Sequence, residues 1–232
     1  MSPKTTRVLV VDDDVEILRL IRRVLEIEGF RVTTAETGEA AMQEMEREQF
    51  DLLVLDLMLP GVDGITVCKH IRDFSTLPVI VLTAKTSVEE KVKALEACAD
   101  DYVTKPFSTQ ELVARVRAAL RRSQMTFPAP SSSRVVSGDL EVNFAARRVT
   151  VAGEEIKLTP TEFNLLQELA LHSGKVLTHA YLLNRIWGSE YRDELRYLHV
   201  FINRLRNKLS LHEENQQMIE SISGVGYRFN IP

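Results

Sequence analysis

The sequence has 232 residues, of which 44% are hydrophobic and 27% charged, and these proportions exclude a disordered or fibrous chain. Apolar runs such as Val8–Val11 and Val79–Leu82 are far shorter than the roughly 20 residues of a membrane span, and the N-terminal MSPKTTR lacks the features of a secretory signal. The net charge of −4 lies entirely in residues 1–122, because residues 123–232 hold 12 basic and 12 acidic residues, so total charge does not indicate a nucleic-acid-binding protein.

The two cysteines, Cys68 and Cys98, stand in no spacing typical of a metal or redox site. We expect them to be reduced, partly buried thiols, as in most cytoplasmic proteins. A cytoplasmic location without a membrane partner is therefore predicted.

Residues 123–133 read SQMTFPAPSSS, with two prolines, four serines and no charge, directly after a strongly helical segment. This composition is typical of a semi-flexible linker. The sequence therefore predicts two domains, 1–122 and 134–232, joined by 123–133.

The first domain alternates strand and helix patterns five times. Strands are predicted at Arg7–Val11, Arg31–Ala35, Leu52–Asp56, Val79–Thr83 and Asp101–Thr104. Amphipathic helices are predicted near Asp14–Glu28, Gly38–Glu48, Ile65–Phe74, Val88–Ala97 and Thr109–Arg122. Strands that are apolar almost throughout predict an α/β fold with a doubly wound, five-stranded parallel sheet covered on both faces.

Polar side chains gather where these strands end. Asp12 and Asp13 follow the first strand, Asp56 ends the third, Thr83 ends the fourth and Lys105 follows the fifth. Ligand chemistry in such folds lies at the carboxyl ends of the strands. Clustered carboxylates repel one another unless a cation lies among them, and an oxygen-only site favours Mg²⁺.

Asp56 stands on the middle strand, where it is best placed to react. An aspartate can attack phosphorus to form an acyl phosphate, and phosphoryl transfer needs mainly positioning and neutralisation of oxygen charge. Mg²⁺ held by Asp13 and Asp56, with Asp12 through water, would supply one neutralising charge and Lys105 another. Thr83 can donate a hydrogen bond to the phosphoryl oxygens. Each acidic or polar residue taken alone also has a purely structural interpretation, such as a helix cap for Asp14. The prediction of a phosphoacceptor site therefore depends on the whole set of residues.

The segments VVDDD, LVLDLMLPGVDG, VLTA and ADDYVTKPF closely resemble the receiver domain of two-component response regulators, a flavodoxin-like fold. The resemblance covers essentially all of residues 1–122. It implies phosphorylation of Asp56 by a sensor histidine kinase, with the backbone carbonyl of Met58 joining Asp12 and Asp13 around Mg²⁺. It also implies a switch pair, Thr83 and Tyr102, and a cis peptide at Lys105–Pro106.

The second domain begins with short strands between Gly138 and Leu158. Thr159-Pro160-Thr161-Glu162 forms a capping box at the start of a helix that Gly174 closes. Further helices are predicted at His179–Trp187 and Asp193–Ser210, and Met218–Ile231 is predicted to form a hairpin around Gly224-Val225-Gly226.

The third of these helices has a predicted buried stripe and an opposite polar face. The stripe holds Leu195, Leu198, Ile202, Leu205 and Leu209, which step three and four residues apart. The opposite face holds Asp193, Arg196, Tyr197, Val200, Asn203, Arg204 and Asn207. Arginine reads guanine, asparagine reads adenine and valine can contact a thymine methyl in the major groove. A solvated helix face with ordinary arginines is the alternative.

Residues 135–232 resemble the α+β winged helix-turn-helix domain of the OmpR/PhoB family. The resemblance is in the order of elements, which is strands, three helices and a terminal hairpin, and in the segments LTPTEFNLL, GKVLT, LRNKL and GVGYRF. The resemblance implies a third helix in the major groove of promoter DNA, a wing at the minor groove and a loop, 188–193, that contacts RNA polymerase. The implied DNA-binding residues are Arg196, Val200, Asn203, Arg204, Arg206, Ser221 and Ser223. Ser223 and Asn203 replace basic residues of many relatives, which weakens the expected contacts, and some helix and wing residues resemble the potassium-responsive branch of the family.

The receiver resemblance also implies a homodimer on phosphorylation, through the fourth helix, fifth strand and fifth helix. The implied dimer face comprises Lys91, Val92, Leu95, Asp100, Asp101, Glu111, Arg115 and Arg122, paired as Lys91–Glu111, Asp101–Arg115 and Asp100–Arg122. A solvated charged face is the alternative, since exposed pairs contribute only about 0–1 kcal/mol each.

Two other functions are open at this point. A haloacid-dehalogenase-like phosphohydrolase also uses a strand-end aspartate with Mg²⁺, but Glu16 stands where its motif has threonine or valine, and the second domain is left unexplained. A constitutive DNA-binding protein with a vestigial receiver conflicts with the intact set of Asp12, Asp13, Asp56 and Lys105. We therefore predict a phosphoacceptor and transcription regulator rather than a turnover enzyme.

Overall fold

The computed structural model describes residues 5–84, 88–125, 134–209 and 218–230. The chain divides into two compact units, Met1–Ser123 and Gln124–Pro232. Helix α5 (Thr109–Gln124) ends at this division, so the first two residues of the predicted linker are helical. Residues 126–133, most of that linker, lie outside the described ranges.

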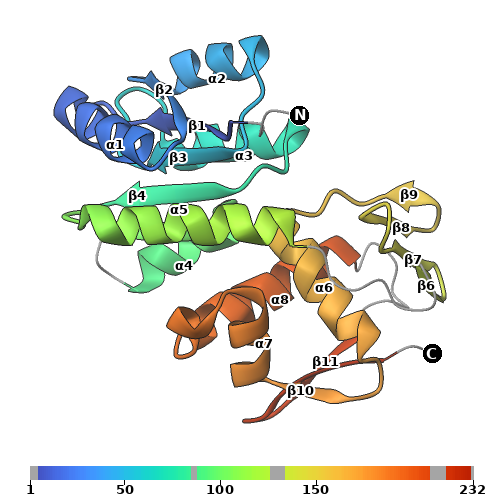
Figure 1. Ribbon diagram of the computed structural model, residues 1–232. Helices are drawn as coiled ribbons and strands as arrows, with labels where there is room; N and C mark the ends of the chain where they lie inside the picture. Colours follow the sequence, from blue (N-terminus) through green and yellow to red (C-terminus); the bar gives the residue numbers. More distant parts are fainter. Residues whose placement is uncertain (1–4, 85–87, 126–133, 210–217, 231–232) are drawn as a thin grey trace. The chain divides into compact units, whose positions relative to one another are not determined.

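The N-terminal unit is a parallel sheet with strand order β2-β1-β3-β4-β5 (Figure 1). Its strands are β1 (Arg7–Val11), β2 (Arg31–Ala35), β3 (Leu52–Asp56), β4 (Val79–Thr83) and β5 (Asp101–Thr104). Its other helices are α1 (Val15–Ile27), α2 (Gly38–Arg47), α3 (Gly64–Phe74) and α4 (Val88–Ala97). The predicted flavodoxin-like class is confirmed, with all five strands at their predicted bounds.

One apolar core lies between this sheet and helices α1 and α5. Alternate strand residues such as Val8, Val54 and Leu82 pack there against Ile21 of α1 and Val116 of α5. The β3 and β4 strands are buried on both faces, which explains their uninterrupted apolar sequences. The first polar residue after each buried strand is thus held rigidly at the sheet edge.

Asp14 begins helix α1, as predicted for this residue. Its side chain accepts hydrogen bonds from the backbone nitrogens of Glu16 and Ile17, two of the donors that a helix N-terminus leaves unpaired. The acidic run after β1 is therefore divided between a helix cap, Asp14, and the two aspartates that precede it.

The prediction of reduced thiols is wrong, because Cys68 and Cys98 form a disulfide. Cys68 lies on α3 and Cys98 directly follows α4, and their Cα atoms are 6.0 Å apart, within the usual range for a cystine. Both residues are buried. The sequence separation concealed the pair because α3 and α4 are packed side by side only in the folded unit.

Within residues 134–209 and 218–230, the C-terminal unit contains two antiparallel sheets and three α-helices. The first sheet comprises β6 (Arg134–Ser137), β7 (Leu140–Asn143), β8 (Arg148–Val151) and β9 (Glu154–Glu155), and the second has the order β10-β12-β11, from β10 (Val176–Thr178), β11 (Ile219–Ile222) and β12 (Gly226–Phe229). The helices are α6 (Pro160–Leu171), α7 (His179–Ile186) and α8 (Leu195–Leu209), with a 3-10 turn at Ser189–Tyr191. This is the predicted winged-helix class, and the capping box of Thr159 and Glu162 is present at α6.

Helix α8 buries a wider arc than the predicted stripe. Leu195 is 42% exposed rather than buried, whereas Tyr197 and Val200, predicted on the outer face, are buried. Tyr197 packs edge to face on Trp187 and Tyr191. A stripe read at steps of three and four identifies the centre of the buried arc but not its width, which aromatic packing extends here.

None of the helices in the four described ranges is both long enough and apolar enough to cross a membrane.

Candidate functional site

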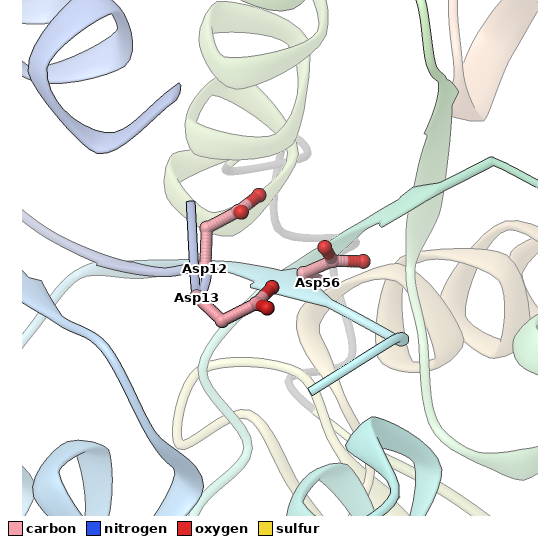
Figure 2. Close-up of side chains that lie close together, drawn as sticks. All are labelled: Asp12, Asp13 and Asp56. Atoms are coloured by element: carbon pink, nitrogen blue, oxygen red, sulfur yellow. The ribbon is translucent and has the colours of Figure 1, made fainter. Parts of the chain in front are cut away.

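The polar residues predicted at the strand ends meet at one edge of the sheet. Lys105 Nζ donates hydrogen bonds to Asp12 Oδ2 at 2.6 Å and to Asp56 Oδ2 at 2.5 Å. Figure 2 shows Asp12, Asp13 and Asp56 side by side at this edge. The structure therefore brings together residues that lie 44 to 93 positions apart along the chain.

The two buried carboxylates are held from both sides. The second oxygen of each accepts a backbone hydrogen bond of 3.0 Å, from the nitrogen of Asp14 for Asp12 and from that of Met58 for Asp56. Candidate ligand oxygens of Asp12, Asp13 and Asp56 lie within 4.8 Å of one another. Asp12 and Asp56 are buried while Asp13 is exposed, so the cluster has one side open to solvent.

Negative charge exceeds positive charge in this acidic cluster. Burial raises the pKa of Asp12 above its ordinary 3.8, although the hydrogen bond from Lys105 acts in the opposite direction. Burial alone would lower the pKa of Lys105, but its hydrogen bonds to Asp12 and Asp56 outweigh burial and raise that pKa above 10.5. Lys105 is therefore charged at neutral pH, and one positive charge faces three carboxyl groups.

Gly64, at the start of α3, is a site residue to which sequence reasoning gave no role. A Cβ at this position would lie 2.4 Å from the backbone oxygen of Asp56 and 2.6 Å from the Cα of Leu57. Only glycine lets α3 approach the end of β3 so closely. The motif LPGVDG contained this signal, because a glycine at a helix start directly after a functional strand end indicates close backbone approach.

The predicted switch residues lie on neighbouring strands. Thr83 is buried at the end of β4, and its carbonyl accepts a hydrogen bond of 2.7 Å from the Lys105 nitrogen. The ring of Tyr102 lies under two cations, with Lys91 Nζ at 5.1 Å and the Arg115 guanidinium carbon at 5.6 Å from its centroid. Tyr102 thus contacts residues of α4 and α5.

The charged residues of the predicted dimer face find partners within the chain. Asp101 is ion-paired with Arg115 at 2.8 Å and with Arg122 at 3.3 Å. Arg115 also contacts Glu111, which is exposed.

The Asp100–Arg122 pair was predicted between two copies of the protein, so the contacts within one chain do not test it. Asp100 is buried, and its Oδ2 accepts hydrogen bonds from Arg72 and from the Val79 nitrogen. Among the apolar members, Leu95 is buried and Val92 partly exposed. Within the chain, Asp100 therefore links α3 to β4.

The exposed face of α8 is a stripe of four polar residues, Arg196, His199, Asn203 and Asn207. They step three, four and four residues apart and so lie along one side of the helix. Arg196, Asn203 and Asn207 were predicted on this face. His199 was missed, although its spacing from Arg196 and Asn203 contained the signal.

Three residues predicted to contact DNA are differently placed. Val200 is buried, and Arg204 Nη2 lies 2.8 Å from Glu162 Oε1, with its guanidinium over the ring of Phe201. Arg206 donates to the carbonyl of Ile219, at 3.1 Å from Nε and 2.6 Å from Nη2. Spacing on a helical wheel could not show these partners, because they lie on α6 and β11.

The β11–β12 hairpin is joined to both helices of the helix-turn-helix. Arg206 Nη2 donates to Ser221 Oγ at 2.9 Å, and the His179 nitrogen donates to the Val225 carbonyl at 3.0 Å. Ser221 and Ser223 are exposed, as a contact surface requires. A Cβ on Gly226 would meet the Leu177 carbonyl oxygen at 1.9 Å, so glycine is needed where β12 pairs with β10.

Comparisons with known proteins agree with both predicted domain classes. Residues 8–117 match the response regulator receiver domain, and residues 153–229 match the family of transcriptional regulatory protein C-terminal domains. The DNA-binding response regulator MtrA of Mycolicibacterium smegmatis is 43% identical over 232 residues, which is 100% of both chains. The chain is an OmpR/PhoB-type response regulator.

Other similar proteins cover nearly the whole regulator. ResD of Bacillus subtilis is 42% identical, with 97% of this chain and 96% of that protein covered, and KdpE of Mycobacterium tuberculosis is 43% identical, with 97% and 99% covered. Among solved structures, a RitR mutant gives a TM-score of 0.80 at 25% identity, covering 98% of this chain and 100% of that one. DrrB, an OmpR/PhoB homologue from Thermotoga maritima, gives 0.52 at 34% identity, covering 97% and 99%.

Membership of this family decides between the functions that the sequence left open. The family consists of DNA-binding response regulators, which are transcription factors rather than enzymes, so the phosphohydrolase is not favoured. A KdpE-named protein among the relatives agrees with the resemblance to the potassium-responsive branch.

Proposed function

We propose that Asp56 accepts a phosphoryl group from a histidine of a sensor kinase in the cytoplasm, and that this promotes dimerisation and binding to promoter DNA. The observation that carries the proposal is the position of Asp56. Its carboxylate is buried at the sheet edge, lies 2.5 Å from Lys105 Nζ and borders the open side marked by Asp13.

The side chains are arranged for an in-line displacement at phosphorus. A carboxylate oxygen of Asp56 forms the new O–P bond while the N–P bond to the kinase histidine breaks, and the nitrogen keeps the electron pair. Lys105 and the Thr83 hydroxyl are placed to neutralise the phosphoryl oxygens. The Met58 nitrogen, 3.0 Å from Asp56 Oδ1, fixes the orientation of the attacking group.

The acidic cluster also fits a divalent cation. Its candidate ligands are all oxygens, lie within 4.8 Å of one another and face a single lysine. Mg²⁺ prefers such a site and keeps several waters. Asp12, Asp13, Asp56 and the carbonyl of Met58 would hold it, and it would add positive charge next to the phosphoryl oxygens.

Phosphorylation would then act through Thr83 and Tyr102. A phosphoryl group carries about −1.5 to −2 charge as a monoester and draws Thr83 and Lys105 toward it. Tyr102 can follow inward only by leaving Lys91 and Arg115, the two cations at its ring. Lys91 then becomes available to Glu111 of a second copy, and Arg115 exchanges its own Asp101 for that of the second copy, in pairs that a two-fold axis repeats.

The exposed stripe of α8 and the wing serines are the proposed DNA contacts. Arg196 suits guanine and Asn203 suits adenine in the major groove, and Ser221 and Ser223 suit the backbone near the wing. Arg206 sets the distance between α8 and the wing, because its guanidinium binds the Ile219 carbonyl. Two tethered domains of a dimer would bind paired half-sites with raised effective concentration.

The loop of residues 188–193 is the proposed contact with RNA polymerase. Tyr191 anchors it against Tyr197, at a ring-centroid distance of 5.5 Å. Glu190, Arg192 and Asp193 remain exposed around this anchor. The loop thus presents three charged side chains from a fixed base.

Intact mass and light scattering test the proposal together. After incubation with acetyl phosphate and Mg²⁺, we expect an adduct of about 80 Da and a shift from monomer to dimer, with neither in Asp56→Asn. The phosphorylated protein should also bind a mixture of promoter DNA fragments more tightly than the unphosphorylated protein does. An unmodified wild-type chain, or an equal adduct on Asp56→Asn, would refute the assignment of Asp56.

A further inference from the structure

Glu162 of α6 is a fully buried carboxylate that contacts the DNA-reading helix. Its Oε2 accepts hydrogen bonds from the Thr159 nitrogen at 2.8 Å and from Lys208 Nζ at 2.7 Å. Its Oε1 forms an ion pair with Arg204, at 2.8 Å from Nη2. The side chain has no exposed surface, and these three partners all lie in the C-terminal unit.

The two cations reach the same carboxylate because they are one helical turn apart on α8. Arg204 and Lys208 are an i, i+4 pair. Each directly follows a residue of the exposed stripe, Asn203 or Asn207, and therefore projects about 100° away from it around the helix. Arg204 is 10% exposed and Lys208 33% exposed in their side chains, so Glu162 turns two charges of the helix inward.

We propose that Glu162 is a positioning residue for DNA recognition, which rests on the proposed DNA contacts of α8. It withholds Arg204 and Lys208 from the phosphate backbone, so that the stripe of Arg196, His199, Asn203 and Asn207 makes the contacts of this helix. Contacts between cations and phosphates add affinity that is independent of sequence and sensitive to salt. Restraining two of them raises the ratio of specific to non-specific binding.

A second carboxylate of α6 provides the matched control. Glu168 is buried like Glu162, but its partners are Tyr181 Oη at 2.6 Å and Arg185 Nε at 3.3 Å on α7, and His172 Nδ1 at 3.4 Å at the end of α6. Glu168→Gln therefore disturbs a comparable buried site on the same helix without releasing a cation of α8. Effects that come merely from loosening α6 would appear in both variants.

The test measures salt dependence on two DNA probes. One is a duplex of about 30 base pairs enriched from a random pool by the phosphorylated wild-type protein, and the other is its scrambled sequence. For Glu162→Gln we expect several-fold tighter binding to the scrambled duplex and a specificity ratio about tenfold lower. The slope of log K against log salt should steepen by about 1 to 2, which corresponds to one or two new phosphate contacts.

Substitutions of the two cations, Arg204 and Lys208, provide a second set of variants for the test. Arg204→Gln and Lys208→Gln should leave the salt slope of the otherwise wild-type protein unchanged, whereas the loss of a cation that binds phosphate would reduce it by about 1. Adding both changes to Glu162→Gln should return its slope to the wild-type value. These single variants keep the test available if Glu162→Gln fails to fold, which circular dichroism would show.

Two results would overturn the inference. One is a parallel fall in specific and non-specific affinity for Glu162→Gln and Glu168→Gln, which would mean a structural role alone. The other is a salt slope reduced by about 1 in Arg204→Gln or Lys208→Gln, which would mean that this cation already binds phosphate in the wild type. Failure of the wild-type protein to enrich any duplex would instead refute the proposed DNA binding.

Discussion

Each of the two units contains a buried cluster of three charged side chains, and the signs of the charges are reversed between the two clusters. In the receiver, one cation, Lys105, lies between the carboxylates of Asp12 and Asp56. In the winged-helix unit, one carboxylate, Glu162, lies between Arg204 and Lys208. The first cluster is left with excess negative charge and the second with excess positive charge.

This difference shows how buried ion pairs can leave one site suited to a cation and another suited to an anion. Buried ion pairs gain little net stability, because desolvation offsets most of the attraction. What remains is the uncompensated charge and the fixed geometry. Excess negative charge beside exposed Asp13 suits a metal ion, whereas the excess positive charge near α8 is reduced, but not removed, before DNA binds.

The largest expected effect comes from removing the central cation of the receiver cluster. Lys105→Met leaves Asp12 and Asp56 buried without their shared partner. We expect phosphorylation by acetyl phosphate to slow roughly 10²–10³-fold, as when one preorganised donor is removed from an active site. A time course of intact mass measures this rate.

The same variant tests whether the cluster has an excess of negative charge. Repulsion between the two carboxylates should destabilise Lys105→Met by about 3–5 kcal/mol, and Mg²⁺ should restore part of this loss. The gain in thermal stability on adding Mg²⁺ should therefore be larger for the variant than for the wild type. Lys69→Met, which changes an exposed lysine of α3, is the control. Equal phosphorylation rates in both variants would contradict the role of Lys105.

Covalent cross-linking is the second difference between the units, since both cysteines of the chain belong to the receiver. The disulfide closes a loop of 30 residues, so Cys68→Ser with Cys98→Ser should lower the free energy of unfolding by about 2–4 kcal/mol. Urea denaturation measures the loss, and wild-type protein with dithiothreitol should show the same shift. If two thiols of unreduced, denatured protein react with iodoacetamide, the disulfide is absent.

A smaller effect is expected at the α6–α7 contact. Tyr181→Phe removes the hydrogen bond from the hydroxyl to Glu168 Oε1, at 2.6 Å, while Arg185 still contacts this carboxylate. Because the accepting group is charged but Tyr181 is 41% exposed, we expect a loss of about 1–2 kcal/mol of unfolding free energy. A double-mutant cycle with Glu168→Gln isolates the pair, and strictly additive losses would show that the two side chains do not interact.

The sequence predicted the receiver more completely than the winged-helix unit. Four of the five receiver strands, β1, β3, β4 and β5, end at or directly before a polar site residue. Parallel strands place their carboxyl ends at one edge, so Asp12, Asp56 and Lys105 could be brought together from topology alone. The disulfide could not, because its two cysteines meet only through the packing of α3 on α4. No local pattern encodes that distance.

In the winged-helix unit the limits are of a different kind. Periodicity located α8, but Arg204 and Val200 were placed on its outer face because a helical wheel does not show the elements that pack beside it. Glu162 had already been explained by the capping box, which is present and accounts for only one of its contacts. A residue with a sufficient local explanation can therefore hide a second, long-range role.

The smallest expected effect is a dependence of winged-helix stability on pH between 7.5 and 5.5. Burial, and then the neighbouring charge of His199, lower the pKa of His179 below its ordinary 6.5. The rings of His199 and Tyr227 lie 5.8 and 5.5 Å away, so the site accommodates neutral imidazole better than its cation. The unfolded chain then binds more protons than the folded one just below pH 6.5, and stability falls as pH is lowered through that range.

His179→Gln should weaken this dependence, measured as the difference in urea midpoint of the C-terminal transition between pH 7.5 and 5.5. The change should be smaller than that caused by Tyr181→Phe, because His179 is only partly buried. His70→Gln, at an exposed position of α3, should leave the dependence unchanged. If His179→Gln keeps the full wild-type difference between the two pH values, the acid sensitivity arises elsewhere, and the histidine pair beside the wing does not set it.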